Sequence, residues 1–210
     1  MKAIMMSIQP TWVSKILNGE KTLEIRKDAP KEWKDYLSGK TKEKPKSKLV
    51  YIYCTKGNEL LIKIGSLRNV DFGYDIITKD SEEYEILKDI SLNGKVVGYF
   101  TLNEVEEIHS CLVPFTFEQT IIDFYTDTYN DMDDLLKASY LDYYSLEQYL
   151  KYAKRGYAWH IDNLVIFDKP KELSEFYKWT DKTMGLHVMP KAKMVRTLTR
   201  APQSWQFIEV

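Results

Sequence analysis

Short apolar runs dominate the pattern of the chain, and few of them have helical spacing. Residues 3–8 form an apolar run that predicts a strand. Pro10 then opens a helix in which apolar side chains recur at helical spacing up to residue 17. Gly19 ends this helix, because glycine adopts the left-handed conformation at no steric cost.

The next segment, residues 19–26, alternates apolar and polar side chains with a period of two. This spacing predicts a strand over residues 21–26. Its two apolar side chains face one way, and Thr22, Glu24 and Arg26 face the other. The segment therefore combines a tight turn with a strand that has one polar face.

Further strands are predicted from β-branched and aromatic runs at residues 49–53, 96–102, 157–161, 164–167 and 205–210. Helices are predicted at residues 145–152, where Ser145 provides the cap and Gly156 the end, and at 171–177, where Pro170 opens the helix. The lysine-rich residues 40–48 are expected to be a loop. Strands outnumber helices without regular alternation, so the predicted class is α+β: a small mixed or antiparallel β-barrel with helices at its mouth.

The composition changes within residues 112–154, which are acidic and rich in tyrosine. We expect this segment to be a helical insertion in a single domain that spans residues 1–210. Its aspartates lack the glycine and distal glutamate of a calcium loop, so no metal is expected. The balance of 30 basic and 31 acidic residues indicates no bulk polyanionic partner, although local basic clusters remain possible sites.

The two cysteines, Cys54 and Cys111, form no CxxC pair, so neither a disulfide framework nor a zinc site is indicated. The first residues become polar too early for a signal peptide, and no apolar run has the length of a membrane span. The expected location is the cytoplasm, with no membrane contact and no cofactor.

Glu24 and Arg26 share a strand face and stand about 7 Å apart at the rise of a strand, so both can contact one ligand. Arginine suits phosphate or a base edge, and glutamate accepts from an amine or acts as a general base. The alternative is a solvated edge strand with a cross-strand ion pair. The pattern alone leaves both interpretations open.

Residues 16–26, ILNGEKTLEIR, preceded by MSIQP at 6–10, resemble the signature of ASCH domains, which belong to the PUA-like superfamily. Later pieces resemble ASCH-like proteins common in bacteriophages and mobile elements: YIYCTK at 51–56, GKVVGYF at 94–100, GYAWHI at 156–161, DKPKEL at 168–173 and APQSW at 201–205. The likeness is weakest over residues 58–92 and in the acidic insertion.

The resemblance implies a PUA-like barrel with a cleft suited to RNA or a nucleotide. Some relatives hydrolyse the amide of N4-acetylcytidine with a Lys, a Thr and a later Glu, and other relatives are ribonucleases. The lysine of the amidohydrolases matches Lys21, whereas Glu24 stands where they carry the threonine nucleophile. Thr22 points the same way but lies two residues earlier.

Other candidates lie on later strands or their ends. His160 can act as an acid, a base or a ligand near neutral pH. The remaining ligand-binding candidates are Tyr53, Lys56, Trp159, Ser204 and Trp205. Trp205 could stack on a base, although a Trp inside a strand, such as Trp159, usually packs in a core. Basic side chains at Lys191, Lys193, Arg196 and Arg200, and those of residues 40–48, could contact phosphates.

Three functions follow from these observations. The first is binding of RNA, single-stranded nucleic acid, a nucleotide or a modified nucleoside beside residues 19–26. The second is a small hydrolase, either amidohydrolase-like or a ribonuclease, in which Lys21 and Glu24 activate water and His160 relays a proton. The third is a phage protein that binds a host protein through the insertion.

Overall fold

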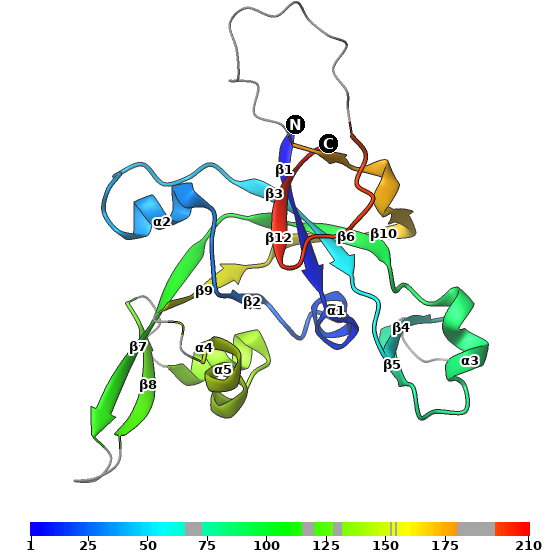
Figure 1. Cartoon of the computed structure of the whole chain (residues 1–210), viewed down its shortest axis with the longest axis horizontal. Helices are drawn as coiled ribbons and strands as arrows, with labels where there is room; N and C mark the ends of the chain where they lie inside the picture. The colour runs from blue at the N-terminus through cyan, green and yellow to red at the C-terminus, as the bar shows by residue number, and fades with distance from the viewer. Residues whose placement is uncertain (66–72, 115–119, 128–131, 152, 154, 180–195) are drawn as a thin grey trace, which may run out of the picture. The chain divides into compact units, whose positions relative to one another are not determined.

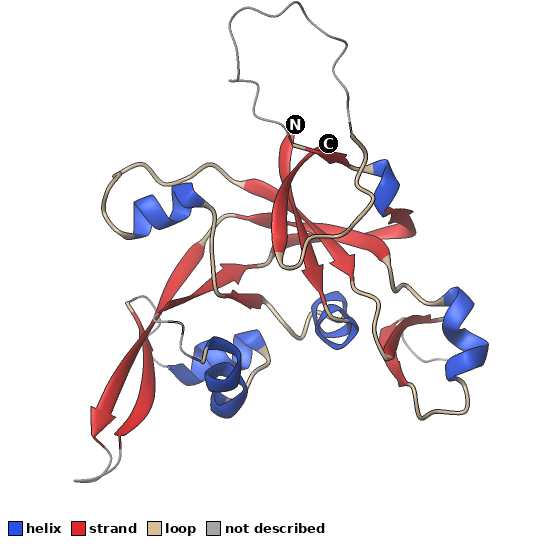
Figure 2. Cartoon of the chain, in the orientation of Figure 1, coloured by secondary structure: helices blue, strands red, loops and turns tan. Residues whose placement is uncertain are grey.

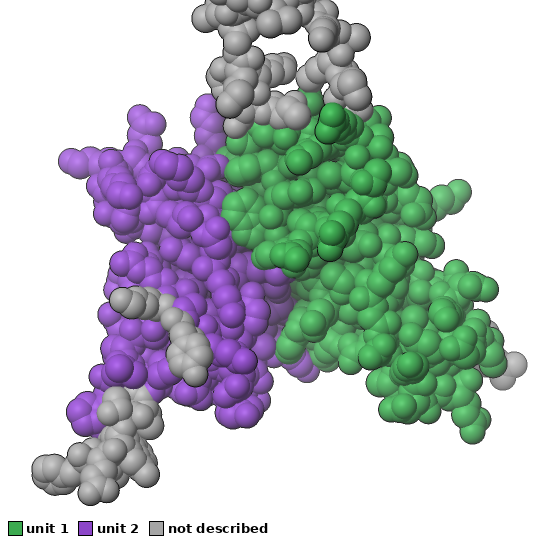
Figure 3. All heavy atoms as spheres, in the orientation of Figure 1, with its two compact units in different colours: residues 1–18, 48–101, 163–210 green, residues 19–47, 102–162 purple. Residues whose placement is uncertain are grey.

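The computed structural model describes residues 1–65, 73–114, 120–127, 132–151, 153, 155–179 and 196–210. The chain folds into two compact units, which Figure 3 shows in different colours. Unit 1 comprises Met1–Asn18, Lys48–Thr101 and Asn163–Val210, and unit 2 comprises Gly19–Ser47 and Leu102–Asp162. Both units contain strands and helices (Figure 2), so the predicted α+β class is confirmed.

Unit 1 is built on a six-stranded mixed sheet with the order β10-β6-β3-β1-β12-β11 (Figure 1). Strand β1 pairs in parallel with β3 and antiparallel with β12. The strands are β1 (Lys2–Ile8), β3 (Lys48–Cys54), β6 (Lys95–Leu102), β10 (Asp162–Glu172), β11 (Tyr177–Lys178) and β12 (Trp205–Glu209). The mixed character of the predicted sheet is thus confirmed.

The remaining elements of unit 1 surround this sheet. Helix α1 (Pro10–Leu17) buries its apolar stripe and contacts the hairpin of β4 (Glu59–Ile64) and β5 (Gly73–Thr78). Two short helical turns follow the hairpin, α3 (Tyr84–Leu87) and η1 (Lys88–Ile90). A third turn, η2 (Leu173–Glu175), follows β10.

Unit 2 has a four-stranded antiparallel sheet with the order β2-β9-β7-β8. Its strands are β2 (Leu23–Arg26), β7 (Val105–Pro114), β8 (Thr120–Thr126) and β9 (Arg155–His160). Helices α4 (Met132–Ser139) and α5 (Tyr143–Leu150) share a hydrophobic core with this sheet. This core contains Leu23 and Ile25 of β2, so the apolar face of the predicted strand is indeed turned inward.

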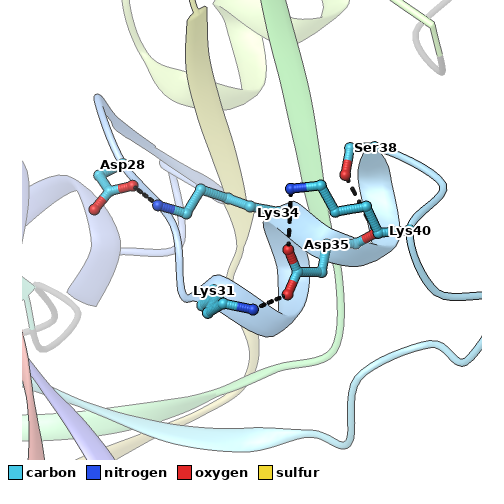
Figure 4. A network of polar contacts seen from close by, with 6 residues as sticks. All are labelled: Asp28, Lys31, Lys34, Asp35, Ser38 and Lys40. Atoms are coloured by element: carbon cyan, nitrogen blue, oxygen red, sulfur yellow. Dashed lines mark hydrogen bonds and ion pairs between the residues drawn. The ribbon is translucent and has the colours of Figure 1, made fainter.

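Helix α2 (Lys31–Leu37) of unit 2 was not predicted from the sequence. Its exposed side carries ion pairs between Lys31 and Asp35, between Lys34 and Asp28, and between Lys40 and Asp35 (Figure 4). These pairs are open to solvent, so each contributes little to stability. The helix is fixed instead by Trp33, which is 1% exposed.

Several sequence predictions are corrected by the structure. The helix expected at 145–152 is α5, which starts earlier because Asp142 caps it by accepting from the Ser145 backbone N–H at 2.6 Å. Gly156 does not end this helix but lies in β9, where an added Cβ would come within 2.9 Å of Leu150. Of the helix expected at 171–177 only the short turn η2 forms, because β10 continues through Pro170 to Glu172. Proline is tolerated there because β10 is an edge strand.

The segment predicted as an insertion, residues 112–154, begins inside β7 and contains β8, α4 and α5. All its described residues belong to unit 2, and the single-domain organisation stays a prediction. Within the part of the chain that the structure describes, no helix is both long and apolar enough to cross a membrane. The basic candidates Lys191 and Lys193 lie outside the described residues.

A candidate ligand-binding site on strand β2

Strand β2 lies at the edge of the unit 2 sheet and places charged side chains in a buried position. The strand pairs with β9 on one side. On the approach to β2, the Thr22 N–H donates to the Ala138 carbonyl of α4 at 2.9 Å. The turn before it has Gly19 at a φ of +75°, a conformation that side chains rarely adopt. This backbone path carries Lys21 back toward the end of α4.

Lys21, Glu24 and Arg26 form one buried charged cluster. Their relative exposures are 3%, 6% and 8%. The Glu24 carboxylate binds both cations: Oε1 lies 3.0 Å from Arg26 Nη2, and Oε2 lies 3.4 Å from Lys21 Nζ. Lys21 also donates to the Ser139 carbonyl at 2.5 Å. Two buried cations therefore contact one carboxylate.

The pKa of Lys21 reflects this buried environment. Burial lowers the pKa of the Lys21 ammonium more than the charge and hydrogen bond of Glu24 raise it, and Arg26 lowers it further. Desolvation disfavours a buried cation unless enough negative charge lies beside it. Glu24, which also contacts Arg26, does not fully offset the effect of burial on the pKa of Lys21.

Tyr149, in the last turn of α5, covers the Arg26 end of the cluster. Its hydroxyl oxygen accepts hydrogen bonds from the Arg26 guanidinium and from the Lys27 backbone N–H. The Lys27 ammonium lies 5.2 Å from the centre of the Tyr149 ring, within cation–π range. Burial raises the pKa of Tyr149, so its hydroxyl stays neutral. With a relative exposure of 38%, Tyr149 is much more accessible than the cluster that it covers.

The pairing register separates His160 from Glu24. In the β2–β9 pair, Glu24 is opposite Trp159 and Leu23 is opposite His160. Residues that are directly opposite in an antiparallel pair point to the same face. His160 therefore lies on the apolar face of β2, and the structure does not bring it together with Lys21 and Glu24.

His160 is paired instead with Glu106 of β7, through His160 Nε2 and Glu106 Oε1. Burial lowers the pKa of His160, but the hydrogen bond and charge of Glu106 raise it more, so the net shift is upward. Glu106 Oε2 is buried and has no hydrogen-bond partner among the described residues. The pair thus joins an imidazole and a carboxylate on the core side of the sheet.

The other predicted residues of unit 2 have clear positions. Thr22 is exposed and lies just before β2, so it is not part of the buried cluster. Trp159 is 0% exposed, as expected for a tryptophan in a central strand. Trp159 therefore offers no open ring face to a base.

Four predicted residues belong to unit 1. Tyr53 is buried in a core cluster with Ala3, Val96 and others. Lys56 is exposed, and its stem runs over Gly94, where an added Cβ would lie 2.7 Å from Lys56 Cε. Ser204 is exposed, and Trp205 is partly buried with its ring 5.7 Å from that of Phe207. These residues stay ligand-binding predictions.

Sequence reasoning missed Ser139, Tyr149 and Glu106 as neighbours of the candidate residues. All three are far from β2 in sequence, and no local pattern distinguishes them from other polar residues. Within the described ranges, no group of three or more His, Cys, Asp or Glu side chains is arranged to hold a metal ion. The chemistry available at β2 is therefore that of two cations, one carboxylate and one phenol.

No protein-family model matches the sequence, and the comparison with curated proteins gives no match. Comparison with solved structures finds the crystal structure of ASCH from Zymomonas mobilis, with 13% identity, a TM-score of 0.47, and coverage of 99% of this chain and 87% of that chain. A serine-to-alanine mutant of the same protein is found with 13% identity, a TM-score of 0.48, and coverage of 99% and 88%. These structures are of the domain type whose signature the sequence resembles.

Proposed function

We propose that unit 2 binds RNA or a nucleotide through the Lys21–Glu24–Arg26 cluster, with the phosphate group at Arg26. The observation that carries this proposal is the shared carboxylate: one anion serves two buried cations. An incoming phosphate would place a further anion beside these two buried cations. Arginine is suited to this contact, because its planar fork matches the oxygens of a phosphate.

The Tyr149 hydroxyl supports a specific position for the phosphate. Its oxygen accepts from one guanidinium and one backbone N–H, which are the donors that a phosphate oxygen uses in proteins. We infer that a phosphate oxygen replaces the phenol oxygen when the ligand binds. The displaced Tyr149 ring, already next to Lys27, would then be free to stack on the base.

Titration of the full chain with inorganic phosphate, a ribonucleoside 5′-monophosphate and a short RNA tests the proposal. Arg26→Gln removes the guanidinium but leaves the ion pair between Lys21 and Glu24, so the fold should persist. Affinity for all three ligands should fall by about 10- to 100-fold, the value of one or two charged hydrogen bonds. Arg155→Gln is the matched control, because Arg155 pairs with Glu107 in the same unit but is largely exposed. Equal affinities for the two variants would refute the proposal.

A second candidate is a hydrolase, which the lowered pKa of Lys21 favours. A neutral amine can act as a general base, and burial brings lysine closer to that state. Glu24 binds both cations and would orient the amine, whereas His160 faces away from them. Turnover of N4-acetylcytidine or RNA that is lost in Lys21→Met and kept in Lys27→Met would support this activity. If the wild type hydrolyses neither substrate, hydrolase activity on these two substrates is excluded.

A further inference from the structure

Unit 1 carries an aromatic cluster that neither the sequence analysis nor the proposed function uses. It crosses three neighbouring strands, β10, β6 and β3, which contribute Phe167, Tyr99 and Tyr51. The ring centroids of Tyr51 and Tyr99 are 5.4 Å apart, and those of Tyr99 and Phe167 are 5.9 Å apart. The three rings therefore form a row across the sheet, which we call the aromatic row.

The aromatic row is supported from the core but is not closed by it. Phe176 is 3% exposed and meets Tyr51 edge-on, with centroids 5.1 Å apart. Tyr51 and Phe167 pack against the core cluster that contains Phe176. All three rings of the row nevertheless keep partial exposure. The buried Phe176 therefore holds the row in place from the core side and leaves its rings partly accessible.

Positive charge gathers beside the aromatic row. Lys171 Nζ lies 5.0 Å from the centre of the Phe167 ring and 6.0 Å from that of Phe176. Lys169 and Lys171 follow Phe167 at alternate positions of β10, and alternate residues of a strand point to the same side. Asp168 points to the opposite side by the same rule. Glu172 and Glu175 form a capping box, in which each side chain accepts a hydrogen bond from the backbone N–H of the other residue. Two lysines of β10 therefore lie on the side of the strand that carries Phe167.

We propose that the aromatic row and Lys171 form a platform on which unit 1 stacks the bases of single-stranded nucleic acid. Aromatic rings on neighbouring strands of a sheet can stack successive bases, and a nearby lysine can contact the phosphates between them. The ring separations exceed the step of about 3.4 Å between stacked bases in a duplex. The platform therefore suits spread, single-stranded bases rather than a duplex.

The two tyrosines add polar contacts to this platform. Burial, and then the neighbouring Tyr99, raise the pKa of Tyr51, so its hydroxyl stays protonated at neutral pH. A neutral phenol can both donate and accept. These hydroxyls can reach base edges or the 2′-hydroxyl of RNA. The platform differs in its residues from the cluster in unit 2, and the proposal does not depend on the function of that cluster.

The test measures binding of the full chain to an eight-nucleotide single-stranded RNA, to a duplex of the same sequence and to a mononucleotide. Tyr99→Leu and Phe167→Leu remove a ring but keep an apolar side chain, which preserves most of the packing. Each variant should bind the single-stranded RNA about 5- to 100-fold more weakly and bind the mononucleotide as the wild type does. Tyr177→Leu is the matched control, because Tyr177 is an exposed aromatic of the same sheet.

Thermal unfolding of each variant establishes that the sheet remains folded. Unchanged affinity of Tyr99→Leu and Phe167→Leu for the single-stranded RNA would overturn the proposal, as would a wild type that prefers the duplex. Arg26→Gln separates the two sites. If the cluster in unit 2 binds no phosphate, the single-stranded RNA should still bind in a manner that depends on Tyr99. If the aromatic row binds no RNA, the affinity for the single-stranded RNA should depend on Arg26 but not on Tyr99.

Discussion

Replacing Glu24 by glutamine tests the electrostatics of the cluster. The substitution keeps the shape of the side chain but removes the negative charge of Glu24, which contacts Arg26 at 3.0 Å and Lys21 at 3.4 Å. All three side chains are at least nine-tenths buried, so water replaces little of the lost interaction. Breaking a buried ion pair from one side costs about 3–5 kcal/mol. We expect Glu24→Gln to lower the free energy of unfolding by this amount.

The loss of stability in Glu24→Gln should also depend on pH. Without Glu24, the two influences that raise the pKa of Lys21 disappear, and burial and Arg26 lower it further. A lysine whose folded pKa lies below its unfolded value of about 10.4 binds fewer protons when folded. Stability therefore rises with pH between the folded and the unfolded pKa. The deficit of Glu24→Gln should shrink as pH increases toward 10.

Urea unfolding at pH 7 and pH 9 measures both effects. Asp28→Asn is the control, because Asp28 and its partner Lys34 have side-chain exposures of 59% and 40%. That pair should contribute about 1 kcal/mol or less. A deficit of Glu24→Gln no larger than that of the control, or a deficit that grows with pH, would refute the reasoning.

Three further predictions follow from single contacts. Tyr149→Phe removes the oxygen that accepts from the Arg26 guanidinium, so phosphate should bind more tightly, by about 3- to 10-fold for the loss of one competing hydrogen bond. Weaker binding in a titration would contradict this. The raised pKa of His160 means that its stabilising pair with Glu106 is complete below the unfolded pKa of about 6.5 and is lost as pH rises through the folded pKa. NMR titration should show this raised pKa fall in Glu106→Gln. Gly98→Ala would place a Cβ 2.3 Å from a backbone oxygen of β10, so it should destabilise the protein by about 1–3 kcal/mol in urea unfolding.

The sequence predicted strand β2 well because its pattern is local. Alternation identified the apolar side of Leu23 and Ile25, and both lie in a core. The polar side was open to two interpretations, a solvated edge or a site, and the structure shows that Glu24 and Arg26 are not solvated. Glu24 and Arg26 are buried, because residues more than 100 positions later in the chain cover them. No period within residues 19–26 carries that information.

The errors of the sequence prediction have a related cause. Pro170 is compatible with a helix start and with an edge strand, and only the strand order shows that β10 is an edge. Gly156 is compatible with a helix end, but its small size is used for close packing against Leu150. A glycine or proline residue determines which backbone conformations are allowed, and tertiary contacts determine which of these forms.

The most direct test of a phosphate site at Arg26 is a crystal structure of the full chain soaked with a ribonucleoside 5′-monophosphate. The phosphate should lie within hydrogen-bond distance of the Arg26 guanidinium and the Lys27 backbone N–H, with the Tyr149 hydroxyl displaced from both donors. A nucleotide bound elsewhere, with Tyr149 still bonded to Arg26, would contradict the account.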